Sequence, residues 1–105
     1  MKQILIDKFL VPREAIEEFT NRMNYNRNII KGIAGFLGDT VYKRADENGK
    51  LIIITIAKWK DENCLANARE KVQSEYKRIG FDLPGFIARL NIKMERGIYQ
   101  EFNTN

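Results

Sequence analysis

The chain has 105 residues, of which 44% are hydrophobic and 30% are charged, and its formal net charge is +4. This length suits one domain, residues 1–105, and the composition is typical of an ordinary globular protein. Lysines and arginines alternate with acids, as in "NAREKVQSEYKR", which is typical of solvated helix faces and disfavours a nucleic-acid partner.

Histidine is absent, and Cys64 is the one cysteine of the sequence. The chain therefore has no imidazole for general-base catalysis or haem ligation, and it has too few ligands for the usual four-ligand zinc site. A single cysteine forms no internal disulfide, which fits a reducing compartment. Because no apolar run approaches the roughly 20 residues that cross a bilayer, and "MKQILIDKFLVP" is too interrupted for a signal peptide, we expect a cytoplasmic protein without a membrane partner.

The first elements follow from the spacing of apolar residues. Residues 3–11 predict a strand, because both alternating sets of side chains are largely apolar. Pro12 suits the first position of a helix, acids follow in the early turns, and apolar residues recur at helical spacing to about Ile30. The asparagines at 24, 26 and 28 are poor helix formers and indicate a frayed or bent helix end rather than a site.

The middle of the chain predicts a hairpin followed by a second helix. Residues 36–43 and 51–59 are strand-like, and the turn "DENG" joins them. Asp61 is expected to cap a helix that ends at Gly80. A short third helix is predicted in "FDLPGFIARLN", with Asp82 as its cap, and a closing strand over residues 93–102.

This order of elements predicts an α+β, ferredoxin-like βαββαβ fold, in which helices cover one face of a four-stranded antiparallel sheet. The strand over residues 51–59 is largely apolar on both of its faces, however. The uncovered face of the sheet would then expose more apolar area than is usual for a monomer. We therefore expect a homodimer in which two sheets pack face to face.

The strand "LIIITIAKW" ends in Trp59, the only tryptophan. If strand alternation continues to its end, Trp59 shares a face with Thr55 and Ala57. A large ring beside two small residues leaves space, which is either filled by a helix side chain such as Leu65 or Tyr76 or forms a ligand pocket. Buried tryptophans are mostly packing elements, which favours the first interpretation. The sequence alone leaves both interpretations open.

The chain resembles the antibiotic biosynthesis monooxygenase-like domains of the dimeric α+β barrel superfamily. The resemblance rests on the strand "ILIDKFLVP", the glutamate-rich "REAIEEF", the Gly35-Phe36 pair in "IAGFLGD", and Trp59 followed by "KDENCLANA". It spans nearly the whole chain and implies a dimer of two ferredoxin-like sheets. The superfamily also holds isomerases, decarboxylases and haem-degrading enzymes, and the last of these bind iron through a histidine that this chain lacks.

The resemblance also implies a reaction and a set of site residues. Some members oxidise phenolic or anthrone-like compounds with molecular oxygen, without metal or flavin, in a pocket lined by the strand-end tryptophan that Trp59 matches. Their asparagine four residues earlier is Thr55 here, and their tyrosine early in the next helix is Leu65. Their arginine near the end of that helix corresponds to Arg78 if a one-residue slip is allowed, and Tyr42 is a further candidate for a pocket hydroxyl.

Two functions follow from these observations. The first is a cofactor-independent monooxygenase that oxidises a small aromatic compound beside Trp59, with Arg78 or a tyrosine hydroxyl stabilising an oxyanion. The second is a non-enzymatic dimeric domain that binds a small ligand or acts as an interaction module. Cys64 lies in the first turn of the second helix, where the dipole is expected to lower its pKa, but without a histidine partner we interpret it as structural.

Overall fold

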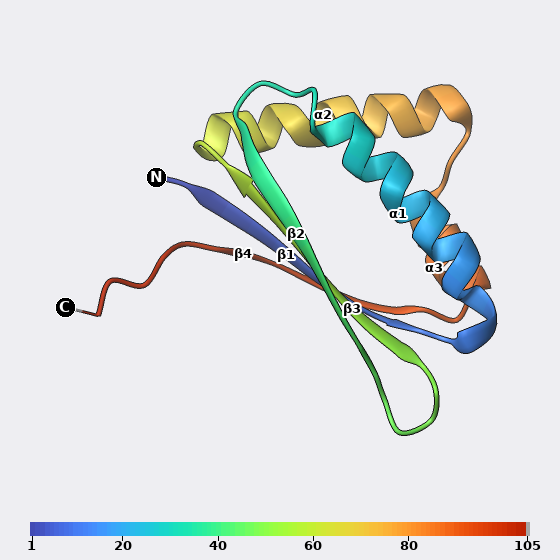
Figure 1. Ribbon diagram of the computed structural model, residues 1–105. Helices are drawn as coiled ribbons and strands as arrows, with labels where there is room; N and C mark the ends of the chain where they lie inside the picture. Colours follow the sequence, from blue (N-terminus) through green and yellow to red (C-terminus); the bar gives the residue numbers. More distant parts are fainter. Residues whose placement is uncertain (105) are drawn as a thin grey trace.

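The computed structural model describes residues 1–104 of the chain. The elements in chain order are β1 (Gln3–Val11), the 3-10 turn η1 (Arg13–Ala15), α1 (Ile16–Ile30), β2 (Phe36–Ala45), β3 (Leu51–Trp59), α2 (Glu62–Ile79), α3 (Leu83–Arg89) and β4 (Lys93–Tyr99). The strands form a four-stranded antiparallel sheet in the order β2-β3-β1-β4, which confirms the predicted ferredoxin-like fold. In Figure 1 the sheet is seen nearly edge-on, and the helices lie on one side of it.

The predicted bounds of the elements hold in most places. The strands β1 and β3 begin and end at the predicted residues. The first helix begins later than predicted, because residues 13–15 form a 3-10 turn. The last strand ends at Tyr99 rather than at residue 102. Tyr99 pairs with Ile4, and β1 begins at the residue before Ile4, so β1 offers almost no further residues for pairing.

Local interactions fix both ends of α2. Asp61 accepts a hydrogen bond of 2.8 Å from the backbone N–H of Cys64, as expected of a cap. Gly80 ends the helix in the left-handed conformation, at φ 71°. Asp82 holds the cap position of α3, but its side chain makes no capping hydrogen bond within residues 1–104, which corrects that expectation.

Gly35 allows the start of β2 to approach the start of α2. Its φ is 88°, and a Cβ there would overlap Sγ of Cys64. Its carbonyl accepts a hydrogen bond of 2.9 Å from the backbone N–H of Lys60. This close approach sets Phe36 edge-on against Trp59, with ring centroids 5.4 Å apart.

The hydrophobic core consists of two separate groups of buried side chains between the sheet and the helices. The first group comprises Phe9, Val11, Ala15, Phe19, Ile53, Phe86 and Ile92. The second comprises Ile33, Trp59, Leu65 and Ala68. The sheet and helices therefore do not enclose one continuous apolar core.

The other face of the sheet is uncovered within the described part of the chain (Figure 1). The strand registers place six aliphatic side chains on it, namely Ile4, Ile6, Leu10, Ile52, Ile54 and Ile56. All six are half-buried, and Tyr42 beside them is 59% exposed. The sheet thus presents a largely aliphatic surface, as the sequence predicts, with Lys8 beside Ile54 and Lys58 beside Ile4 on the same face. No helix among residues 1–104 is both long enough and apolar enough to cross a membrane.

Candidate functional site

A cavity of about 780 Å³ lies between the covered face of the sheet and the helices α1 and α2. We call it the inner cavity. Both core groups contribute to its walls, with Phe9, Phe19 and Phe86 from the first and Trp59, Leu65 and Ala68 from the second. Its volume lies in the range of small-molecule sites. The gap between the two core groups is therefore large enough to hold a ligand.

The floor of the inner cavity is made of small and polar side chains. The antiparallel register sets Asp7 beside Thr55 on one side and beside Arg96 on the other, which gives a polar row across β3, β1 and β4. The next row pairs Leu5 with Ala57. Because Thr55 and Ala57 are short, the floor leaves room above it.

Asp7 and Arg96 form a bidentate ion pair in this floor. The Nε and Nη2 atoms of Arg96 donate to the two carboxylate oxygens of Asp7 at 2.7 and 2.8 Å. The side chain of Asp7 is 9% exposed and that of Arg96 is 44% exposed. The hydrogen bond with Asp7 raises the pKa of Arg96 despite its partial burial. The carboxylate is thus fixed in position at the cavity wall.

Tyr76 of α2 and Asn26 of α1 bring polar groups to the roof. Burial raises the pKa of the Tyr76 hydroxyl, while a hydrogen bond with the Asn26 side chain acts in the opposite direction. The charges of Asp7 and Arg96 also act on this hydroxyl. Tyr76 therefore keeps its proton at neutral pH and is available as a hydrogen-bond donor.

Two buried polar atoms in the cavity-lining residues have no hydrogen-bond partner within residues 1–104. They are Oδ1 of Asn26 and Nε1 of Trp59. Buried polar atoms are nearly always paired, and exceptions call for an explanation. Both atoms are themselves almost inaccessible, so they do not by themselves mark a ligand site.

The structure brings three of the five predicted site residues to the inner cavity. Trp59, Thr55 and Leu65 all line it. Trp59 is 2% exposed and belongs to the second core group. The two interpretations of this tryptophan therefore hold together, because the ring packs in the core on one side and forms a cavity wall on the other.

Arg78 and Tyr42 lie elsewhere, which corrects their expected place in the pocket. Arg78 follows Tyr76 by two residues, about 200° around the helix, so it points away from the cavity and pairs with Glu75. Tyr42 pairs with Ile54 in the sheet and shares the uncovered face with it.

Among the polar groups of the inner cavity that the sequence did not indicate as site residues are Asp7, Arg96, Asn26 and Tyr76. For Asp7 a signal exists, since it is the one acid in the alternating set that contains Leu5, Phe9 and Val11. Asn26 was interpreted as a sign of a bent helix end, yet α1 continues to Ile30. Its side chain serves the cavity instead.

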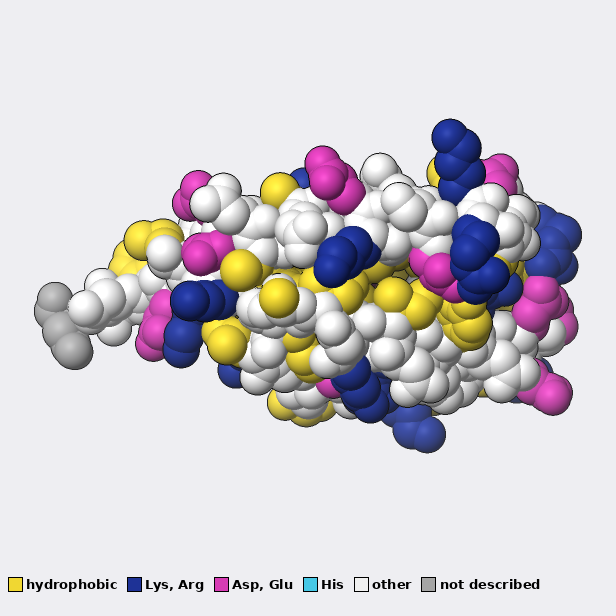
Figure 2. Space-filling model, turned by 90° about the horizontal axis from the view of Figure 1, so that it is seen from above, with side chains coloured by type: hydrophobic (Ala, Val, Ile, Leu, Met, Phe, Trp, Pro, Cys, Tyr) yellow, Lys and Arg dark blue, Asp and Glu magenta, His cyan; other side chains and the backbone are white. Residues whose placement is uncertain are grey.

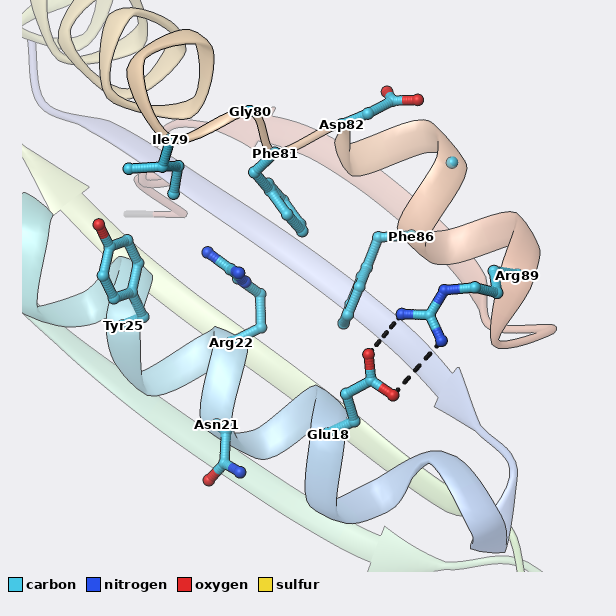
Figure 3. A pocket seen from close by; sticks show the side chains of 11 residues that line it. Glu18, Asn21, Arg22, Tyr25, Ile79, Gly80, Phe81, Asp82, Phe86 and Arg89 are labelled. Atoms are coloured by element: carbon cyan, nitrogen blue, oxygen red, sulfur yellow. Dashed lines mark hydrogen bonds and ion pairs between the residues drawn. The ribbon is translucent and has the colours of Figure 1, made fainter.

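A second hollow of about 770 Å³ lies on the outside of the helix layer, between α1, the α2–α3 connection and α3. We call it the outer cleft. Figure 3 shows Arg22 and Tyr25 reaching into it from α1, opposite Phe81 and Phe86. Glu18 and Arg89 form an ion pair across it. Seen from above, hydrophobic side chains follow a seam through the middle of the molecule, with Lys and Arg side chains at its borders (Figure 2).

Cys64 and the acidic residues offer no further site. A side-chain hydrogen bond with Asp61 raises the pKa of the Cys64 thiol, which corrects the expected lowering by the helix dipole. Among residues 1–104, no group of three or more Cys, Asp or Glu side chains is arranged to hold a metal ion.

Solved structures share this fold, whereas no family profile and no curated protein sequence matches the chain significantly. A candidate monooxygenase from Shewanella loihica is 19% identical with a TM-score of 0.72, over 98% of this chain and 96% of that one. SnoaB, a cofactor-independent oxygenase from Streptomyces nogalater, is 19% identical with a TM-score of 0.68, over 98% and 95% of the two chains in a mutant structure.

A dimeric ferredoxin-like protein from an uncultured marine organism is more distant in sequence, at 9% identity, with a TM-score of 0.64 over 97% of this chain and 98% of that one. At these identities the similarity concerns the fold alone. The resemblance inferred from the sequence is therefore confirmed at the level of architecture: the chain has the α+β, ferredoxin-like fold that antibiotic biosynthesis monooxygenase-like proteins share.

Proposed function

We propose that the chain is a cofactor-independent monooxygenase that oxidises a small aromatic or phenolic compound with molecular oxygen in the inner cavity. The observation that carries the proposal is the cavity itself. It is bounded by the Trp59 ring and crossed by the polar row Thr55, Asp7 and Arg96. The fold shared with SnoaB, described as a cofactor-independent oxygenase, supports the same reaction class.

The chemistry needs an electron-rich substrate and no external reductant. An anthrone-like methylene group loses a proton, and the resulting anion transfers electrons to oxygen. One oxygen atom becomes a carbonyl oxygen on the substrate and the other leaves as water, so the substrate supplies all four electrons. The protein needs to bind the substrate, accept its proton, stabilise the anion and exclude bulk water.

Residues of the inner cavity can take each of these roles. The carboxylate of Asp7 is positioned to accept the proton, because Arg96 holds it in a fixed orientation at the wall. The hydroxyl of Tyr76 stays protonated and donates to the developing oxyanion. The apolar side chains of Trp59 and Leu65 pack against the aromatic rings, and Thr55 contributes a hydroxyl to the floor.

Oxygen uptake tests this proposal. The protein is mixed with dihydroxyaromatic and anthrone-like compounds in the presence of a metal chelator, and the Tyr76→Phe variant is compared with Tyr42→Phe. The first substitution removes a hydroxyl from the cavity, and the second removes one from the uncovered sheet face. We expect Tyr76→Phe to slow uptake by about tenfold to a hundredfold and Tyr42→Phe to leave it unchanged. Equal rates in both variants would exclude the role of Tyr76, and no uptake with any compound would refute the oxygenase.

A non-enzymatic ligand-binding domain is the second candidate, and the same cavity favours it. In that case aromatic compounds would quench the fluorescence of Trp59, which lines the cavity, without any consumption of oxygen. Binding with turnover supports the first proposal, and binding without turnover supports the second.

We further propose that the protein is a homodimer joined through the uncovered sheet face. The six aliphatic side chains on that face provide the apolar surface that a stable interface buries. A structurally similar protein is itself described as dimeric. Sedimentation at micromolar concentration is expected to give twice the chain mass of 12.3 kDa, and a stable monomer would refute this arrangement.

A further inference from the structure

We propose that the inner cavity and the outer cleft form one continuous binding site for an aromatic ligand that carries a carboxylate, and that Arg22 binds this carboxylate. The inference deepens the proposed function, because it names the chemical class of the substrate. It concerns binding, however, and is tested by affinity without turnover.

The two hollows meet at the same side chains. Arg22, Phe81, Asp82 and Phe86 line both of them. Arg22 comes from α1, while the two aromatic rings come from the α2–α3 connection and from α3. A ligand that fills the inner cavity and extends outwards would therefore pass the guanidinium of Arg22.

No carboxylate among residues 1–104 lies within ion-pair distance of Arg22, although Glu18 is near enough for the two charges to interact. Of the other arginines that line the inner cavity, Arg27 pairs with Asp39 at 2.6 Å and Arg96 with Asp7 at 2.7 Å, whereas Arg69 of α2 has no ion pair among residues 1–104. Arg22 has no such partner. A half-buried, unpaired guanidinium at the junction of two hollows favours an anionic ligand.

The acids near Arg22 are directed elsewhere. Glu18, one turn earlier on α1, is held by Arg89 (Figure 3). The carboxylate of Asp82 points away from Arg22 and lies over Gly85, where an added Cβ would meet its Oδ2 atom. Neither acid occupies the position that a ligand carboxylate would take.

Two aromatic rings flank the guanidinium of Arg22. Its guanidinium carbon lies 4.0 Å from the ring centroid of Phe81 and 5.1 Å from that of Tyr25. The Tyr25 hydroxyl donates to Glu75 of α2 at 3.0 Å, which fixes that ring. Stacking uses the faces of a guanidinium, so its in-plane N–H groups remain for bidentate binding of a carboxylate.

Two naphthalene probes with the same ring system test the inference. 3-Hydroxy-2-naphthoate and 2-naphthol share a ring and a hydroxyl group and differ in the carboxylate. Their affinities are measured by quenching of Trp59, which lines the cavity, and by equilibrium dialysis. We expect the naphthoate to bind about tenfold more tightly, because a hydrogen bond to a charged group is stronger than a neutral one.

Variants assign that preference to one side chain. Arg22→Gln is expected to remove the preference while leaving 2-naphthol binding intact. Arg22→Lys, which keeps the charge but loses the planar fork, should retain part of it. Arg44→Gln removes the same charge from β2, outside both hollows, and is expected to bind like the unmodified protein. Circular dichroism checks that each variant is folded.

The outcomes separate this inference from the proposed function. Equal affinity for both probes, a preference that survives in Arg22→Gln, or no binding of either probe by dialysis would overturn the inference. A carboxylate preference that depends on Arg22, without oxygen uptake, would refute the oxygenase and retain the inference. Oxygen uptake that is unaffected by Arg22→Gln, together with equal probe affinities, would support the oxygenase and overturn the inference.

Discussion

The middle of β3 carries small side chains on the face under the helices and bulky aliphatic side chains on the uncovered face, the reverse of what is expected in a monomer. The face under the helices carries Thr55 and Ala57 at its middle, whereas the uncovered face carries Ile52, Ile54 and Ile56. In a sheet with one solvated side, the bulky aliphatic residues are expected on the covered face. The covered face is thus shaped to leave space, and the uncovered face is shaped to be buried by something else.

On β1 the contrast is confined to one position. Asp7 lies buried under the helices between Leu5 and Phe9, while Ile6 and Lys8 lie on the uncovered face. A charge in this position is tolerated because Arg96 binds both carboxylate oxygens. The ligand site proposed for one face and the dimer interface proposed for the other can therefore be tested separately.

The largest effect is expected from Ile54→Lys on the uncovered face. A lysine at the centre of a buried apolar interface has no partner, and its desolvation costs several kcal/mol. We expect the dissociation constant of the dimer to rise by more than about a hundredfold. Sedimentation measures the association, and circular dichroism checks the fold. Glu47→Lys in the exposed β2–β3 turn is the control and should leave the dimer intact. A dimer that persists in Ile54→Lys would place the interface elsewhere.

On the covered face, Asp7→Ala tests the paired charge. Removal of one partner from a buried ion pair leaves the other uncompensated, which costs about 3–5 kcal/mol when both are fully buried. Because the side chain of Arg96 is 44% exposed, we expect a smaller loss, about 2 kcal/mol of the free energy of unfolding. Urea denaturation at neutral pH measures it.

The control for this substitution is Glu75→Ala. It breaks the exposed ion pair with Arg78 on α2, together with the hydrogen bond from Tyr25, and is expected to lower stability less than Asp7→Ala does. Equal losses in both variants would mean that the Asp7–Arg96 pair is no more important than a surface pair.

The sequence was sufficient for features that depend on near neighbours. The bounds of β1 and β3, the Asp61 cap and the Gly80 end are all local, and the structure confirms them. Strand alternation from Trp59 also correctly placed Thr55 on the covered face, beside the cavity. These predictions needed only the periods of a strand and a helix.

Features that depend on distant pairing could not be obtained in this way. Asp7 and Arg96 are 89 residues apart and meet only because β1 and β4 pair in one particular register. Arg78 was placed in the pocket by a one-residue slip, and on a helix each residue turns the side chain by about 100°. Tyr42 was placed without knowing which face of the sheet the helices cover.

The smallest expected effect concerns the pH dependence that Tyr76 gives to stability. Burial raises the pKa of its hydroxyl above the ordinary value of about 10. Below that value both folded and unfolded chains hold the proton, so the contribution to stability is complete. As the pH rises past it, the unfolded chain ionises first, and this contribution is lost as the pH passes through the folded pKa.

We therefore expect the free energy of unfolding to fall more steeply with pH above 10 in the unmodified protein than in Tyr76→Phe. Urea denaturation at several alkaline pH values measures the two slopes. Tyr42→Phe, which changes the uncovered face, is expected to keep the steep slope of the unmodified protein. If Tyr76→Phe keeps it as well, the hydroxyl is solvated in the folded state, and it could not serve as the protonated donor that the covered face supplies to a ligand.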